Sequence, residues 1–221
     1  MSGQPVICER PCDARNTAGP TRFVVITGGP GAGKTTVLDM ARKILCEHVA
    51  VLPEAASLVY GGGFWRLQSQ SGRAAAQRAI YHVQRQLENV ALGENRWPVT
   101  LCDRGTLDGL AYWPEPQETF WDMAGSSMEQ EYARYAAVIH LQSPSEEMGY
   151  NHQNSLRIET AHQARELDEK IGALWSRHPR YTMIESRPGF LEKVRLAITA
   201  ITRELPRDCR AVAEAAGLET V

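Results

Sequence analysis

The sequence predicts an α/β protein in which a five-stranded parallel sheet lies between two layers of helices. Short apolar runs rich in β-branched residues alternate along the chain with longer segments whose apolar residues recur at helical spacing. Such alternation is typical of parallel sheets, because each helix returns the chain to the same end of the sheet. A glycine-rich segment between the first apolar run and the first helical segment supports the same fold, since such loops join a strand to a helix.

The elements follow in order along the chain. In the first half of the chain, the apolar pattern predicts strands at residues 22–27, 48–53 and 97–103 and helices at residues 36–46 and 73–92. In the second half of the chain, the same pattern predicts strands at residues 136–142 and 181–185 and helices at residues 160–175 and 189–204. The buried stripe of the long helix at residues 73–92 is predicted to consist of Ile80, Val83, Leu87 and Val90.

Length and composition indicate a single folded domain at residues 21–205. A chain of 221 residues with 43% hydrophobic content can bury one substantial core. Residues 1–20 are rich in Pro, Gly, Ser, Asn and charge, so they are predicted to form a mobile leader. Residues 206–221 are predicted to form a C-terminal tail.

Charge and hydropathy argue against two classes of partner. The formal net charge of −2 provides no basic field for nucleic acid, and no apolar run reaches the length of a membrane span. The five cysteines are scattered and odd in number, which favours free thiols and a cytoplasmic location. Cys8 and Cys12 have no second Cys or His pair nearby at zinc spacing.

Residues 28–35 read Gly-Gly-Pro-Gly-Ala-Gly-Lys-Thr, which matches the phosphate-binding loop (P-loop) pattern in full. The pattern places backbone N–H groups around a polyphosphate, and glycine is needed at Gly28, Gly31 and Gly33 because a β-carbon would block the approach. Lys34 supplies a cation for the β and γ phosphates. The nucleotide is expected to contact Gly28, Gly29, Pro30, Gly31, Ala32, Gly33, Lys34, Thr35 and Thr36.

Oxygen ligands for Mg²⁺ are predicted at two positions. The Thr35 hydroxyl stands at the start of the helix after the P-loop, and Asp103 closes an apolar strand. Arg104 follows at once and can bind a hydroxyl or phosphate of a substrate. The alternative for Asp103 is a cap on a helix that starts near Thr106.

Glu54 follows the second predicted strand and is a candidate base for a hydroxyl acceptor. Alternatively, Glu54 is a solvated glutamate in a loop without a catalytic role. Gln77 and Gln84 lie seven residues apart on the long helix with Tyr81 between them, so they can offer amide groups and a stacking ring to a planar base. Alternatively, these residues lie at the solvent-exposed edge of an amphipathic helix and bind no ligand.

The polar segment at residues 143–158 is too long for a simple turn and lies between a strand and a helix. It is predicted to be a lid that carries Arg157 over the γ phosphate, with Arg165 as a weaker candidate for that role. The alternative is a passive surface loop.

Three segments carry a resemblance to a known family. They are Ile-Thr-Gly-Gly-Pro-Gly-Ala-Gly-Lys-Thr-Thr (26–36), Leu-Pro-Glu-Ala-Ala (52–56) and Cys-Asp-Arg-Gly-Thr-Leu-Asp-Gly-Leu-Ala-Tyr (102–112). The chain resembles the small P-loop proteins of the AAA type that are regarded as ATPases or kinases of NAD metabolism, including the domain similar to ribosylnicotinamide kinase. The resemblance implies the P-loop NTPase fold and the strand order 2-3-1-4-5 of nucleoside and nucleotide kinases. It also places Asp103 and Arg104 at the acidic-Arg pair of those kinases, and Arg157 in their lid.

The residues and the resemblance together predict a phosphotransferase that depends on ATP and Mg²⁺ and acts on a small hydroxyl or phosphate acceptor, such as a nucleoside-like molecule. Glu54, Gln77, Gln84 and Arg104 are the expected acceptor-binding residues. The alternative is a switch protein that binds ATP or GTP and acts without a small-molecule acceptor. The absence of an Asn-Lys-x-Asp guanine signature favours ATP. Segments 61–65 and 113–128 match no substrate signature of the family.

Overall fold

The computed structural model describes residues 20–144, 161–187 and 189–215. Its strands are β1 (Arg22–Thr27), β2 (Val49–Leu52), β3 (Val99–Asp103), β4 (Tyr135–Leu141) and β5 (Tyr181–Ile184). They form one parallel sheet in the order β2-β3-β1-β4-β5. The predicted parallel sheet and its strand order 2-3-1-4-5 are therefore confirmed.

The helices lie between and after these strands. They are α1 (Lys34–Ile44), α2 (Ala55–Gly61), α3 (Gln70–Glu94), α4 (Asp108–Ala111), α5 (Gln117–Ala124), α6 (Met128–Ala133), α7 (Ala161–Trp175), α8 (Phe190–Glu204) and α9 (Arg207–Ala215). The segment at residues 113–128 thus contains α5 and the start of α6, which the sequence did not indicate.

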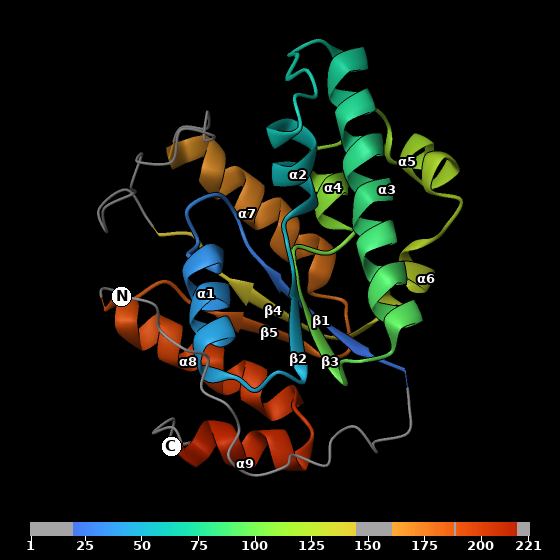
Figure 1. Cartoon of the computed structure of the whole chain (residues 1–221). Coiled ribbons are helices and arrows are strands. Elements are labelled where there is room, and N and C mark those ends of the chain that lie inside the picture. Colours follow the sequence, from blue (N-terminus) through green and yellow to red (C-terminus); the bar gives the residue numbers. More distant parts are fainter. Residues whose placement is uncertain (1–19, 145–160, 188, 216–221) are drawn as a thin grey trace.

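Side chains of the central strand alternate between two apolar clusters, one on each face of the sheet. Val24 and Ile26 of β1 pack in a cluster with residues of α1 and α8, which lie together on one side of the sheet (Figure 1). Phe23 and Val25 of β1 pack in the opposite cluster, where Trp175 of α7 is fully buried. Alternation is expected of a strand that is covered on both faces. The result is the predicted three-layer αβα architecture.

The predicted buried stripe of α3 is wrong. Val90 is 60% exposed, and Ile80, Val83 and Leu87 are only partly buried. The buried positions of α3 are Ala74, Ala76, Tyr81, Gln84, Glu88 and Ala91. Glu88 can occupy this face because it pairs with the Arg134 guanidinium and accepts a hydrogen bond of 2.8 Å from the Tyr135 hydroxyl. A buried carboxylate is tolerated where such partners replace water.

The helix α9 continues the fold beyond α8. Leu205 and Cys209 are 2% and 1% exposed and belong to the same apolar cluster as α1 and α8. At the same end of the sheet, Glu204 forms ion pairs with Arg22 at the start of β1 and with Arg180 before β5. The segment after residue 205 is therefore packed against the domain through at least its first turn.

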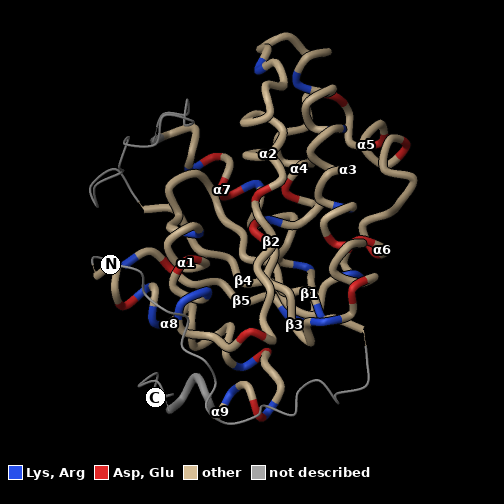
Figure 2. Tube along the Cα trace, viewed as in Figure 1, with Lys and Arg blue, Asp and Glu red and all other residues tan. Residues whose placement is uncertain are grey.

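Basic and acidic residues are mixed over the described chain, and neither sign gathers on one side (Figure 2). Among the described residues, no helix has the length and apolar character needed to cross a membrane.

Candidate functional site: the P-loop and the pocket beside it

The P-loop connects β1 to α1 at the carboxyl end of the sheet. Gly28, Gly31 and Gly33 have positive φ angles of 135°, 81° and 93°, which L side chains rarely adopt. A β-carbon at Gly28 would lie 2.1 Å from the carbonyl oxygen of Leu141. The predicted need for glycine at these three positions agrees with the backbone that the structure places there.

Lys34 lies against the loop that precedes it. Its Nζ donates hydrogen bonds of 2.9 Å to the carbonyl oxygens of Gly28 and of Gly29, and the side chain is buried. Burial and the positive charge of Arg104 lower the pKa of Lys34 to about 8. The cation is thus held at the mouth of the loop by two neutral carbonyl groups, which anionic phosphate oxygens can replace.

Two side chains from helices that are distant in the sequence form hydrogen bonds with the backbone of the P-loop. Asp168 of α7 accepts a hydrogen bond of 2.6 Å from the backbone N–H of Gly29. Lys193 of α8 donates a hydrogen bond of 2.8 Å to the carbonyl oxygen of Ala32. Sequence reasoning missed both residues, because each lies in an ordinary helical segment without a motif.

Arg104 is the centre of an ion-pair group beside the P-loop. Its Nε lies 2.8 Å from Glu54 Oε1, and its Nη1 lies 3.2 Å from Asp108 Oδ1 and from the carbonyl oxygen of Gly28. Burial raises the pKa of Glu54, but Arg104 and the Ser57 hydroxyl outweigh it and lower the value to about 2. Glu54 is therefore ionised throughout the physiological pH range.

Asp108 supports this ion-pair group through further hydrogen bonds. It accepts hydrogen bonds from the Thr27 hydroxyl at 2.5 Å and from the Trp175 indole at 3.0 Å. Besides Arg104, it also contacts the backbone N–H of Gly105, which donates a hydrogen bond of 3.1 Å to Asp108 Oδ2. The sequence analysis gave Asp108 no role, although it is the second acid of the segment 102–112 that carries the family resemblance.

Asp103 lies at the end of β3, where its Oδ1 is buried and has no hydrogen-bond partner among the described residues. Burial is the main cause that raises the pKa of Asp103 to about 6, and the nearby Lys34 opposes it. The structure does not support the alternative of a helix cap, because α4 starts at Asp108 without a side-chain cap. An unpaired buried carboxylate oxygen is a suitable ligand for a hard cation.

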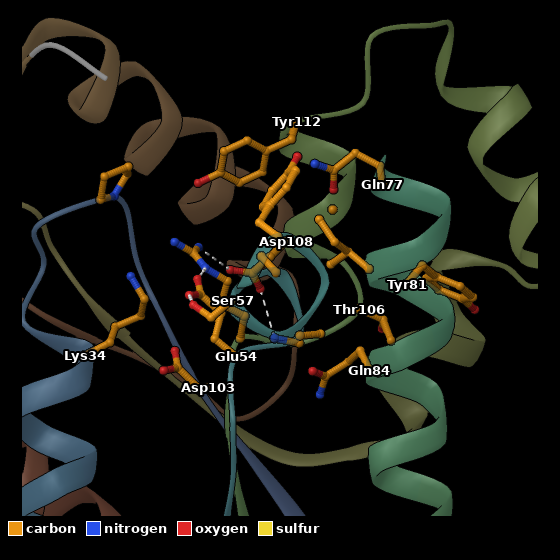
Figure 3. A pocket seen from close by; sticks show the side chains of 18 of the residues that line it. Lys34, Glu54, Ser57, Gln77, Tyr81, Gln84, Asp103, Thr106, Asp108 and Tyr112 are labelled. Atoms are coloured by element: carbon orange, nitrogen blue, oxygen red, sulfur yellow. Dashed lines mark hydrogen bonds and ion pairs between the residues drawn. The ribbon is translucent and has the colours of Figure 1, made fainter. Parts of the chain in front are cut away.

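Thr35 and Asp103 line the same pocket, so the residues present fit a Mg²⁺ ion bound through oxygen atoms. Figure 3 shows Lys34 and Asp103 on one side of this pocket and Gln77 and Gln84 of α3 on the other. We call it the phosphate-loop pocket. Its lining comprises Pro30, Gly31, Lys34, Thr35, Glu54, Ala55, Ala56, Ser57, Tyr60, Arg66, Gln77, Ile80, Tyr81, Gln84, Asp103, Arg104, Gly105, Thr106, Asp108, Gly109 and Tyr112.

The predicted amide face of α3 lies at the pocket, but the predicted stacking ring does not face its centre. Gln77 is partly exposed, whereas Gln84 is buried and donates a hydrogen bond of 2.8 Å to Glu88. The Tyr81 hydroxyl donates to Glu131, on the side of α3 away from the pocket (Figure 3). The ring of Tyr112 lies beside the ion-pair group, with its centroid 5.8 Å from Arg104 Cζ.

The predicted lid falls largely outside the described residues. Arg157 is among the residues that the structure does not describe, as is most of segment 143–158. Ser143, at its start, lies with its hydroxyl 3.2 Å from the carbonyl oxygen of Pro30. The weaker candidate Arg165 does not line the pocket: its side chain is 71% exposed and lies 3.9 Å from Glu169.

A P-loop at the carboxyl edge of a 2-3-1-4-5 parallel sheet, with an acid at the end of β3, defines a nucleotide-binding protein with the P-loop NTPase fold. The family model described as an AAA domain matches residues 23–193, and the chain belongs to this family. Thymidylate kinase from Ehrlichia chaffeensis has a similar structure at 13% sequence identity and a TM-score of 0.49, over 84% of this chain and 99% of that chain. A comparison with curated proteins gives no match.

Proposed function

We propose that the protein transfers the γ-phosphoryl group of ATP to a hydroxyl or phosphate of a small acceptor of the nucleoside type, with Mg²⁺. The observation that carries the proposal is the phosphate-loop pocket itself. The P-loop cation Lys34 and the ionised Glu54 line one cavity together with polar side chains of α3. A protein that only bound a nucleotide would not require a second polar wall beside its phosphate site.

The roles follow from charge and position. Lys34 and the backbone N–H groups of the P-loop bind the β and γ phosphates. Thr35 and Asp103 hold Mg²⁺, which neutralises charge on those phosphates when it is bound. The unpaired Oδ1 of Asp103 supports this assignment.

The acceptor binds between Arg104 and α3. Glu54 stays ionised and accepts a hydrogen bond from the acceptor hydroxyl, which orients that oxygen for attack on the phosphorus. A pKa of about 2 makes Glu54 a weak base, so Glu54 takes the proton late, once the new O–P bond lowers the basicity of the acceptor oxygen, and passes it to solvent. As that bond forms, the bond from the γ phosphorus to the bridging oxygen breaks and ADP leaves with the electron pair. Gln77 and Gln84 are the amide contacts for the acceptor. The predicted contact of Arg157 with the γ phosphate lies outside the described residues.

One observation favours a second candidate, a nucleotide-dependent switch that acts on a protein partner. Between α2 and α3, Phe64, Trp65 and Leu67 are 40%, 76% and 50% exposed. Exposed apolar side chains grouped in one segment mark interaction surfaces. The two candidates differ in whether ATP consumption requires an acceptor.

ADP formation with ATP and Mg²⁺, measured over a panel of nucleosides and related metabolites, tests the proposal. We expect at least one acceptor to raise ADP formation well above the rate without acceptor, with the phosphorylated acceptor appearing in equal amount by mass spectrometry. Lys34→Ala abolishes transfer, whereas Lys43→Ala at the exposed end of α1 retains it. Hydrolysis that no acceptor stimulates, together with a change in Trp65 fluorescence on nucleotide binding, would favour the switch instead.

A further inference from the structure

A cluster of two thiols and an imidazole lies at the amino-terminal edge of the sheet, opposite the phosphate-loop pocket. Cys46 and His48 precede β2, and Cys209 lies on α9. One ligand atom of each residue lies within 4.8 Å of the other two, and all three side chains are at least nine-tenths buried. In Figure 1, α9 lies at the bottom of the view, below α8.

His48 provides a second, independent observation. The residue is 5% exposed, and neither Nδ1 nor Nε2 has a hydrogen-bond partner among the described residues. A neutral imidazole carries one N–H donor and one acceptor nitrogen, and leaving both unpaired in a buried site costs free energy. A bound cation would satisfy the acceptor nitrogen directly.

We propose that Cys46, His48 and Cys209 bind a zinc ion that fastens α9 to the turn between α1 and β2. Thiolate sulfur and imidazole nitrogen are the ligands that Zn²⁺ prefers in proteins. In a tetrahedral site two thiolates at a Zn–S distance of about 2.3 Å lie about 3.8 Å apart. The three ligand atoms lie within 4.8 Å of one another, so a movement of about 1 Å or less brings them to a common ion. Each thiol releases its proton to solvent on binding, and the imidazole binds in its neutral form.

The surroundings fit a structural ion rather than a catalytic one. Cys46, Leu205 and Cys209 belong to one apolar cluster, and Ile44 and Leu45 pack against it. Such a shell keeps substrate-sized molecules away from the ion, so the fourth position, which no protein ligand fills, is left to one enclosed water molecule or hydroxide. The site is chemically distinct from the pair Thr35 and Asp103, which offers only oxygen atoms.

The sequence alone did not indicate this site. Cys46 and His48 are two residues apart, but Cys209 follows 161 positions after His48, and zinc motifs are recognised by two close pairs of ligands. Only the packing of α9 against the first βα unit brings the third ligand into place. Zinc binding would therefore couple the C-terminal helix to the stability of the whole domain.

Cobalt titration of the reduced full-length chain tests the proposal. We expect thiolate-to-cobalt charge-transfer absorption that saturates at one Co²⁺ per chain and disappears when Zn²⁺ is added. The absorption is lost in Cys209→Ala and in Cys46→Ala. It is retained in Cys102→Ala, which removes a buried thiol on β3 that is not part of the cluster. Zinc raises the melting temperature of the wild type and of Cys102→Ala, and it does not raise that of Cys209→Ala.

Three results would overturn the proposal. They are the absence of thiolate absorption in the reduced wild type, its retention in Cys209→Ala, and a Cys46–Cys209 disulfide in freshly purified protein by mass spectrometry. Because a variant can fail to fold, X-ray absorption at the zinc edge of the loaded wild type gives a readout without substitution. Two sulfur ligands and one nitrogen ligand of the imidazole type support the site, and any other set of protein ligands contradicts it.

Discussion

Asp168 holds the backbone N–H of Gly29 at 2.6 Å, although the two residues are 139 positions apart. The same carboxylate lies 3.0 Å from His140 Nε2 and accepts a hydrogen bond of 3.2 Å from the backbone N–H of Ser143. One acid of α7 thus connects the P-loop, the strand β4 and the start of the segment after β4. We expect this residue to set the shape of the P-loop without contacting the nucleotide.

Asp168→Ala should weaken ATP binding and lower the free energy of unfolding by about 2 kcal/mol, because it leaves a buried N–H without its acceptor. Nucleotide titration and urea unfolding measure the two effects. Glu169→Ala, at an exposed position of the same helix, is the matched control and should change neither. An Asp168→Ala protein with wild-type affinity for ATP would show that the P-loop keeps its shape without this contact.

Lys193→Met should weaken ATP binding about tenfold, which corresponds to about 1.4 kcal/mol. Methionine preserves much of the side-chain length but removes the hydrogen bonds that Lys193 Nζ donates to the carbonyl oxygens of Ala32 and Gln142. The Kd for ATP is the measurement, and Arg195→Met, exposed on the same helix, is the control. Equal affinities in both variants would contradict a role of Lys193 in positioning the P-loop.

Asp103→Asn should raise the Mg²⁺ concentration needed for half-maximal activity while leaving the binding of metal-free ATP unchanged or tighter. The substitution removes a negative charge from the nucleotide site, and it replaces one carboxylate oxygen by an amide that binds Mg²⁺ weakly. Magnesium titrations of activity, alongside ATP titrations in a chelator, separate the two effects. Asp39→Asn, on the exposed face of α1, should behave as the wild type. A normal Mg²⁺ requirement in Asp103→Asn would assign the metal to other ligands.

The Glu54–Arg104 pair predicts a dependence of stability on pH. The pKa of Glu54 is about 2 in the folded chain against 4.5 for an ordinary glutamate. Since the folded value is the lower one, the ionised carboxylate stabilises the fold above pH 4.5, by about 3 kcal/mol, and this contribution is lost as the pH falls toward 2. The stability difference between wild type and Glu54→Gln should narrow by about 1 kcal/mol between pH 6 and pH 3.5 in urea unfolding. A difference that stays constant over this range would contradict the low pKa.

The sequence was sufficient for the strands and the P-loop because their signals are local. The strand Arg22–Thr27 has an unbroken apolar centre that is mostly β-branched, and the spacing of the glycines that follow matches the P-loop pattern. The buried face of α3 could not be predicted in this way. Glu88 is buried only because Arg134 and Tyr135, about 46 residues away, supply its partners.

Dependence on residues that are far away in the sequence also explains which parts of the site could not be predicted. The predicted residues Lys34, Glu54, Asp103 and Arg104 lie at strand ends or in motifs, and the structure brings them to one pocket. Asp168 and Lys193 act on the P-loop from helices that follow it by more than 130 residues. Contacts of this kind depend on how the helices pack, and no pattern within a short window of sequence records them.

The backbone of the P-loop is held by contacts with Asp168, Lys193 and Lys34, all of which come from the chain itself. Because the protein's own side chains already fix the backbone of the loop, we expect the loop to lose little conformational entropy when it binds a nucleotide. Association should appear in stopped-flow traces as a single phase whose observed rate constant rises linearly with ATP concentration. Nucleotides that bind with different affinity would then differ mainly in their dissociation rate constants.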